Sequence, residues 1–144
     1  MTTLVYRDGI LAADRIMLQG SIKCAEFSKI AKAPNGAIGG AAGDLKGVRK
    51  FLDWIQAGAT GVPPVSSKAE GYVIFTSERL FSWDGVPTLT EVFAPFLAVG
   101  SGWEVALGAL AMGADARRAV EIAAQFDANS GGGIDILTLE REQT

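Results

Sequence analysis

The sequence predicts a single mixed α+β domain that spans residues 1–144 and combines antiparallel strands with three helices. Short apolar runs bounded by turn residues are typical of strands, and they occur at both ends and in the middle of the chain. Apolar residues at the three- and four-residue spacing of a helix follow the first group of strands. Because 144 residues, 49% of them hydrophobic, can bury one core but hardly two, we expect one domain.

The first part of the chain is predicted to form strands joined by tight turns. A strand-like run precedes the Asp8-Gly9 pair, which suits a tight hairpin, and a second apolar run follows at 10–13. Further on, a Pro-Asn-Gly turn at 34–36 leads into the Gly-rich run 37–44, which we expect to open a helix.

Three helices and several more strands are predicted after this run. An amphipathic helix extends from Asp44 to about Ala57, and its apolar positions are Leu45, Val48, Phe51, Leu52 and Ile55. Glycine and proline residues at 58–64 end it. We expect further strands at 72–75, 80–83 and 96–99, helices at about 101–112 and 115–126, and a last strand around 134–139.

The residue inventory excludes several kinds of catalytic site. The chain has no histidine, which rules out Ser-His-Asp and Cys-His catalysis and any imidazole metal site. Cys24 is the only cysteine, so an internal disulfide and a cysteine zinc cluster are impossible, and we expect no metal or cofactor. A hydrolase with this inventory must use a carboxylate pair, a lysine or the N-terminal amine as its base.

Charge and hydropathy argue against nucleic-acid and membrane partners. The net charge is −3 and the pI is near 4.9, and no basic cluster could neutralise phosphates. The longest apolar stretch, residues 106–114, is far shorter than the roughly 20 residues needed to cross a bilayer. The first residues do not have the pattern of a signal peptide. We therefore expect a cytoplasmic protein.

The second residue carries the most distinctive chemistry. Removal of Met1 would make Thr2 the N-terminus, with a hydroxyl nucleophile and an α-amine on one residue. That amine has an intrinsic pKa of about 7.7–8.0, so it can act as a base near neutral pH. Methionine aminopeptidase should favour removal before a small threonine. If Met1 stays, Thr2 carries an amide and this base does not exist.

Five separated motifs follow Thr2 in a characteristic order. They are Asp14, Lys29, the Gly-rich run 37–44, Gly100-Ser101-Gly102 and the Asp-x-x-Ser-Gly motif at 127–131. This order resembles the proteasome β-subunit family, and most closely its bacterial HslV-type peptidase branch. The resemblance implies a self-compartmentalising threonine endopeptidase from a bacterium or a bacterial virus.

The resemblance implies a role for each motif. Thr2 Oγ would be the nucleophile, and its own α-amine would accept the proton. Lys29 would favour deprotonation of that hydroxyl, and Asp14 would hold and neutralise the lysine ammonium. The Gly40 N–H would face the developing oxyanion. Three further residues would fix the α-amine by hydrogen bonding: Ser101, Asp127 and Ser130.

The resemblance also implies a substrate pocket and partners. Five uncharged residues would surround the substrate side chain that precedes the scissile bond: Met17, Phe27, Ala31, Ile38 and Ala42. A charged side chain would lose its hydration there without a buried partner, so we expect a preference for neutral, apolar residues, with Ile38 limiting the depth. The implied substrates are peptides or unfolded proteins. The implied partners are further copies of the chain, which would form two stacked homo-oligomeric rings, and an ATP-dependent unfoldase.

The family fold is a four-layer αββα sandwich, with two packed antiparallel sheets between helix layers, and the predicted element order is compatible with it. The chain departs from the family between Asp44 and Tyr72, where members usually have two helices and this sequence predicts one. That region contributes to ring-to-ring contacts in the family, so the usual oligomer is in question. In addition, Phe126 precedes Asp127 where proteasome subunits often have arginine.

Other interpretations of the same residues stay open. The Gly-rich run superficially resembles a phosphate cradle but lacks the Gly-Lys-Ser/Thr ending, and Ser101 could be an ordinary helix N-cap. The pattern after Asp127 imitates half of a calcium loop, yet it has Thr138 where glutamate is required. For the whole chain, the alternatives are an inactive ring-forming structural protein and an N-terminal-nucleophile amidase that acts on a small amide.

Overall fold

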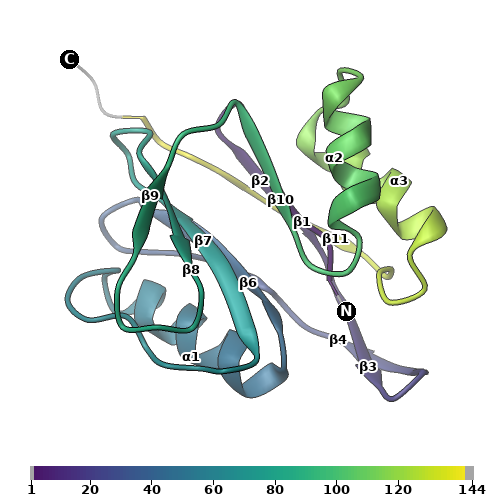
Figure 1. Cartoon of the computed structure of the whole chain (residues 1–144), viewed down its shortest axis with the longest axis horizontal. Coiled ribbons are helices and arrows are strands. Elements are labelled where there is room, and N and C mark those ends of the chain that lie inside the picture. The colour runs from purple at the N-terminus through teal and green to yellow at the C-terminus, as the bar shows by residue number, and fades with distance from the viewer. Residues whose placement is uncertain (1, 142–144) are drawn as a thin grey trace.

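The structure, a computed structural model, describes residues 2–141, which form eleven strands and three helices (Figure 1). The strands are β1 (Leu4–Arg7), β2 (Ile10–Asp14), β3 (Ile16–Gln19), β4 (Ile22–Glu26), β5 (Ile30–Lys32), β6 (Ile38–Gly43), β7 (Ala69–Ile74), β8 (Leu80–Trp83), β9 (Thr90–Val92), β10 (Phe96–Val99) and β11 (Ile134–Thr138). The helices are α1 (Leu45–Gln56), α2 (Trp103–Ala111) and α3 (Ala116–Phe126).

The N-terminal hairpin lies at the centre of a four-stranded antiparallel sheet with the strand order β10-β1-β2-β11. Its turn places Asp8 and Gly9 at φ angles of 50° and 81°, and a two-residue hairpin turn of this type requires positive φ at both positions. The predicted hairpin is confirmed. Thr2 precedes β1 and Asp14 ends β2, so the hairpin brings both residues to one end of the sheet.

The second sheet has five antiparallel strands in the order β5-β6-β7-β8-β9. The Gly-rich run forms its strand β6, so the prediction that this run opens a helix is wrong. Small residues fit this strand because its neighbours are close. A Cβ atom at Gly39, for example, would lie 2.5 Å from the Tyr72 carbonyl oxygen. Helix α1 begins at Leu45, and between Asp44 and Tyr72 it is the only helix, as predicted.

Two of the three helices begin at an aspartate that caps them. Asp44 before α1 and Asp115 before α3 each accept a hydrogen bond from the N–H three residues later, at 2.9 and 2.8 Å. Each bond satisfies one N–H that lacks a partner within its helix. Helix α2 has no side-chain cap, so Ser101 is not an N-cap. No helix within residues 2–141 is long and apolar enough to cross a membrane.

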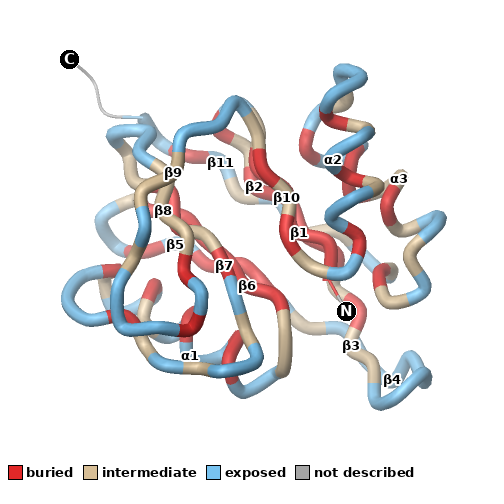
Figure 2. Tube along the Cα trace, in the orientation of Figure 1, coloured by how far each residue is buried: buried red, intermediate tan, exposed pale blue. Residues whose placement is uncertain are grey.

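Helices cover one face of each sheet, and the other faces share a core. Helix α1 packs on β5, β6 and β7, whereas α2 and α3 pack on β1, β2 and β10 (Figure 1). On the α1 side, Phe51 stacks on Trp83 with ring centroids 4.4 Å apart. A second cluster contains residues of both sheets: Leu4, Tyr6, Leu11, Ala13, Leu97 and Val99 with Ile30, Ile38 and Ile74. Figure 2 shows that the buried segments follow these central strands.

Strands β3 and β4 form a separate two-stranded hairpin that extends from the body of the molecule (Figure 2). All five residues of β4 are exposed. Because neither face of this strand is buried, it does not need the alternation of apolar and polar residues that predicts a half-buried strand. Its base is tied to the segment before β11. Arg15 contacts Asp135 at 2.6 Å and Glu26 at 3.5 Å, and Glu26 accepts a hydrogen bond from the Gly133 N–H at 2.9 Å.

Candidate active site

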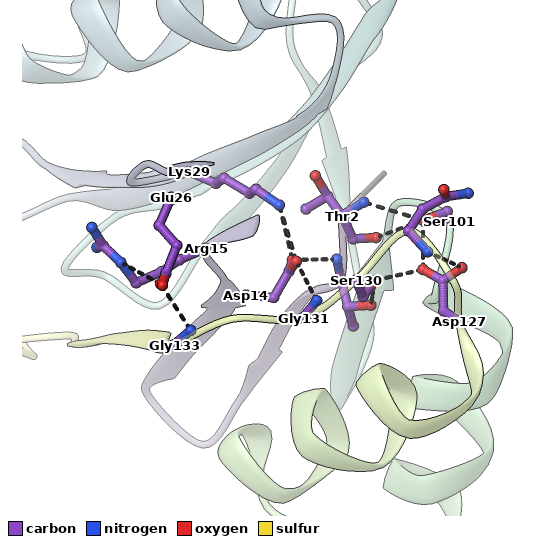
Figure 3. Close-up of polar contacts among 12 residues, drawn as sticks. Thr2, Asp14, Arg15, Glu26, Lys29, Ser101, Asp127, Ser130, Gly131 and Gly133 are labelled. Atoms are coloured by element: carbon purple, nitrogen blue, oxygen red, sulfur yellow. Dashed lines mark hydrogen bonds and ion pairs between the residues drawn. The ribbon is translucent and has the colours of Figure 1, made fainter. Parts of the chain in front are cut away.

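Six of the seven residues that we predicted to be catalytic meet near the N-terminus (Figure 3). They are Thr2 before β1, Asp14 at the end of β2, Lys29 just before β5, Ser101 in the β10–α2 turn, Asp127 at the end of α3 and Ser130 in the α3–β11 loop. The seventh, Gly40, lies within β6. The site therefore draws on both sheets and on the loops around the two C-terminal helices.

A buried ion pair lies on one side of Thr2. Lys29 Nζ is 3.1 Å from both carboxylate oxygens of Asp14, and neither side chain is exposed to solvent. The same carboxylate accepts hydrogen bonds from the N–H groups of Thr3, at 2.9 Å, and Gly131, at 3.0 Å. A buried charge is tolerated when it is paired and hydrogen-bonded in this way.

Burial is the main influence on the charge of Lys29. It lowers the pKa of the Lys29 ammonium below the usual lysine value, and the attraction and hydrogen bond of Asp14 oppose that shift in part. In the view of Figure 3, the ammonium lies above the Asp14 carboxylate and to the left of Thr2. A cation at this position stabilises negative charge that develops on an oxygen atom close to it, such as a deprotonated hydroxyl.

A second set of hydrogen bonds lies on the other side of Thr2. The Thr2 nitrogen donates to Ser101 Oγ at 3.1 Å, and Ser101 Oγ donates to Asp127 Oδ2 at 2.6 Å. Ser130 Oγ donates to the same carboxylate oxygen at 2.5 Å. Partial burial raises the pKa of Asp127, but the hydrogen bonds from Ser101 and Ser130 outweigh it and leave the pKa below its usual value. Asp127 is therefore an ionised acceptor.

Two glycines allow the β10–α2 turn to approach the N-terminal residues. Gly100 has a φ angle of 101°, and a Cβ atom there would lie 2.1 Å from the Thr2 carbonyl oxygen. A Cβ atom at Gly102 would lie 2.0 Å from Thr3 Oγ1. The Gly-Ser-Gly motif thus places Ser101 against Thr2 because neither neighbour carries a side chain.

Thr3 is a member of the site that we did not predict. It is fully buried, its N–H bonds to Asp14, and its Oγ1 lies 2.8 Å from Ser130 Oγ. It therefore contacts both sets of hydrogen bonds that flank Thr2. Its position next to Thr2 and the inward direction of alternate strand residues are the sequence signals that could have identified it.

Gly40 does not line the site, because of the way β6 pairs with its neighbours. The Ala41 N–H donates to the carbonyl oxygen of Lys29 on the β5 side, whereas the Asp44 N–H donates to the carbonyl oxygen of Lys68 on the β7 side. Backbone groups alternate in direction along an antiparallel strand, so the Gly40 N–H points toward β7. By the same alternation, the Gly43 N–H points to the β5 side, beyond the end of β5.

The predicted substrate-contacting residues do not surround one cavity. Met17 lies on the β3–β4 hairpin, Ala31 belongs to the cluster under α1, and Ile38 is fully buried in the cluster that both sheets share. Phe27 borders a hollow beside α1. Only Ala42 lies beside Ser101.

A cavity of about 440 Å³ lies next to Ser101. The backbone of Gly43 and Gly100 borders it, together with Ala42 and residues before β7 and after β8. Its charged side chains are Lys68, Glu70 and Asp84. This cavity is thus more polar than the neutral pocket that we predicted, and the predicted preference for apolar substrate residues stays a prediction.

Two further features bear on the chemistry. Within residues 2–141, no group of three or more acidic, cysteine or histidine side chains is placed to hold a metal ion. Met1 lies outside the described residues, so its predicted removal stays a prediction.

Comparisons with known proteins agree with this architecture. No family model matches the sequence, and no curated protein matches it. BPH from Thiobacillus denitrificans in complex with epoxomicin has a similar structure, with a TM-score of 0.68 and 21% identity over 99% of both chains. A second BPH structure has a TM-score of 0.64 and 21% identity over 96% of this chain and 97% of the other.

Eukaryotic HslV from Trypanosoma brucei is similar to the same extent, with a TM-score of 0.69 and 20% identity over 98% of this chain and 100% of the other. The match extends over nearly the whole of both chains, so it concerns the whole domain and not one part of it. The chain therefore has the fold that HslV and BPH share, as its resemblance to the HslV-type branch predicted.

Proposed function

We propose that this chain is a threonine-type endopeptidase of the proteasome β-subunit family that uses Thr2 after removal of Met1. One observation carries the proposal: Thr2 lies between a buried Lys29–Asp14 pair and the Ser101–Asp127 hydrogen bonds that hold its nitrogen. The shared fold with HslV supports it. The arrangement also supports the family's four-layer αββα sandwich as the description of this single domain.

The hydrogen bonds orient the proposed base. A serine hydroxyl has one hydrogen, and that of Ser101 is directed to the acceptor-only carboxylate of Asp127. The Thr2 nitrogen must therefore donate to Ser101. In a free amine the lone pair is then directed away from Ser101, and we propose that it accepts the proton of the Thr2 hydroxyl.

The reaction then follows from these positions. Thr2 Oγ attacks the carbonyl carbon of the peptide while its proton passes to the α-amine, and Lys29 stabilises the developing alkoxide. The C–N bond breaks, and the leaving amine takes the proton from the Thr2 ammonium. Water hydrolyses the resulting ester and regenerates Thr2.

The Gly43 N–H is a better candidate than that of Gly40 for binding the oxyanion. It points to the open side of β6 and borders the same cavity as Gly100 and Ser101, whereas the Gly40 N–H faces β7. One such donor is typically worth about 10²–10³ in rate. The amide signal of Gly43, and not of Gly40, should therefore move when a peptide boronate binds to Thr2.

Peptides or unfolded proteins are the proposed substrates, and an ATP-dependent unfoldase is the proposed partner in the cytoplasm. The position of Gly43 on β6 beyond the end of β5 supports a peptide substrate, since an extended chain can pair with the edge of a sheet. No basic surface for nucleic acid is expected at a net charge of −3.

The chain is further proposed to form a homo-oligomeric ring. Large apolar side chains are exposed on and beside the two C-terminal helices: Trp103, Leu107, Met112 and Phe126. Large apolar side chains that are exposed in one subunit are often buried in subunit contacts. Light scattering on the purified protein should give a mass several times that of one 15.0 kDa chain. A monodisperse monomer at micromolar concentration would instead favour the amidase that acts on a small amide.

Two measurements on one sample test the proposed activity. Intact mass should show that Met1 is absent, and the same sample should cleave fluorogenic peptides. A sample that keeps Met1 and still cleaves at the normal rate would contradict the mechanism. An inactive sample that keeps Met1 would favour the inactive ring-forming protein, and a Met1-free sample that cleaves no peptide would favour the amidase that acts on a small amide.

A further inference from the structure

Thr3 joins the two sets of hydrogen bonds that flank Thr2. Its backbone N–H donates to Asp14 Oδ1 at 2.9 Å, and Asp14 holds Lys29. Its side-chain Oγ1 lies 2.8 Å from Ser130 Oγ, which reaches Asp127. The backbone of Thr3 therefore bonds to the Asp14 carboxylate that holds Lys29, and its hydroxyl bonds to the serine that contacts Asp127.

The directions of these hydrogen bonds follow from the number of hydrogens available. Asp127 is ionised and can only accept, so the single hydrogen of Ser130 is directed to it. Ser130 Oγ must then accept from Thr3, and the Thr3 hydroxyl is the donor. One continuous chain results, from Thr3 through Ser130, Asp127 and Ser101 to the Thr2 nitrogen.

The surroundings leave Thr3 little freedom. It is 0% exposed, and Gly102 is so close that a Cβ atom there would lie 2.0 Å from Thr3 Oγ1. Asp14 also returns a hydrogen bond from its own N–H to the Thr3 carbonyl oxygen at 3.3 Å. A side chain held this firmly can fix the orientation of the groups that it bonds to.

We propose that Thr3 is a positioning residue, whose hydroxyl orients Ser130 and Asp127 and thereby holds the Thr2 amine toward its own hydroxyl. The proposal rests on the proposed function of Thr2 as nucleophile and adds a residue to that site. Thr3 does not contact the substrate in this scheme. It acts on the rate of the chemical step and not on substrate binding.

Valine and serine substitutions separate positioning from packing. Thr3→Val keeps the shape and removes the hydroxyl, whereas Thr3→Ser keeps the hydroxyl and removes a methyl group. We expect Thr3→Val to lower kcat on the order of tenfold with KM unchanged, and Thr3→Ser to retain most of the activity. A residue that mattered only for packing would give the opposite order, because serine leaves the larger cavity.

Three controls complete the experiment. Thr138→Val makes the same exchange at an exposed position of β11 and should leave kcat unchanged. In a Ser130→Ala background, Thr3→Val should cause no further loss if it acts through Ser130. The pKa of the Thr2 amine, followed by ¹⁵N NMR on Met1-free protein, should move in Thr3→Val and stay unchanged in Thr3→Ser.

The outcomes distinguish this proposal from the proposed function. The role of Thr3 would be overturned if Thr3→Val and the wild type had equal kcat, or if neither substitution moved the pKa of the amine. Either result would leave the proposed role of Thr2 as the nucleophile intact. An inert wild-type protein would overturn the proposed function, and the amine pKa would then decide the role of Thr3 without any activity.

Discussion

Thr2→Ala is expected to lower the rate of peptide hydrolysis by at least about 10⁴-fold, because it removes the atom that attacks the substrate. Few contacts are lost with it, since the Thr2 nitrogen keeps its hydrogen bond to Ser101. The thermal midpoint should therefore stay close to that of the wild type. Initial rates on a fluorogenic peptide and a thermal melt of the same Met1-free sample measure both quantities.

Thr2→Ser is the matched control for this experiment. Serine keeps a hydroxyl and an α-amine on one residue, so it should retain much of the activity that alanine loses. If Thr2→Ala keeps most of its activity, the N-terminal-nucleophile assignment is wrong. The reacting group would then have to be sought elsewhere on the chain.

Lys29→Met is expected to remove nearly all activity and also to destabilise the fold. The substitution removes the cation beside Thr2 and leaves the Asp14 carboxylate buried without its ion-pair partner. Breaking a buried pair from one side typically costs about 3–5 kcal/mol. The Thr3 and Gly131 N–H groups still bond to Asp14, which places the expected cost at the lower end of that range. Denaturant unfolding and peptide turnover measure the two effects.

A double variant separates stability from catalysis. Asp14→Asn combined with Lys29→Met has no buried charge at this position, and the asparagine oxygen can still accept a backbone hydrogen bond. We expect it to regain much of the stability lost in Lys29→Met and none of the activity. Recovery of activity in the double variant would show that the Lys29 charge is not required.

The lowered pKa of Lys29 adds a pH dependence with a definite sign. In the folded state the pKa lies below the ordinary lysine value of 10.5, because burial disfavours the ammonium. Between these two pKa values the unfolded chain binds more protons, so the free energy of unfolding should rise with pH there. Activity should fall over the same range if the Lys29 charge is required. Lys29→Met should lack this rise in stability.

Local patterns account for the parts of the fold that were predicted correctly. The Asp8-Gly9 turn, the amphipathic spacing after Asp44 and the apolar run 96–99 each concern residues that are neighbours in sequence. The Gly-rich run was misassigned because glycine and alanine carry no periodic signal. Only the close approach of Tyr72 and Ile55 shows why the strand has a glycine at position 39.

The residues of the candidate site also fall into those that the sequence predicted and those that it did not. The order of motifs identified six residues that the fold gathers, but it missed Thr3 and assigned the oxyanion to the Gly40 N–H, which the alternation along β6 directs toward β7. A shift of one residue along a strand reverses the direction of its backbone and side chains. Strand register, and not residue type, therefore decides which N–H faces Thr2.

The sequence by itself determined the inventory of chemistry: no histidine, one cysteine, a threonine after Met1, and the aspartates that begin two helices. These follow from composition and from interactions within a few residues. Only the tertiary structure decided that Lys29 is buried against Asp14 and that Thr3 reaches Ser130, 127 positions away. Such contacts depend on how both sheets and the C-terminal loop pack, and no local pattern encodes that packing.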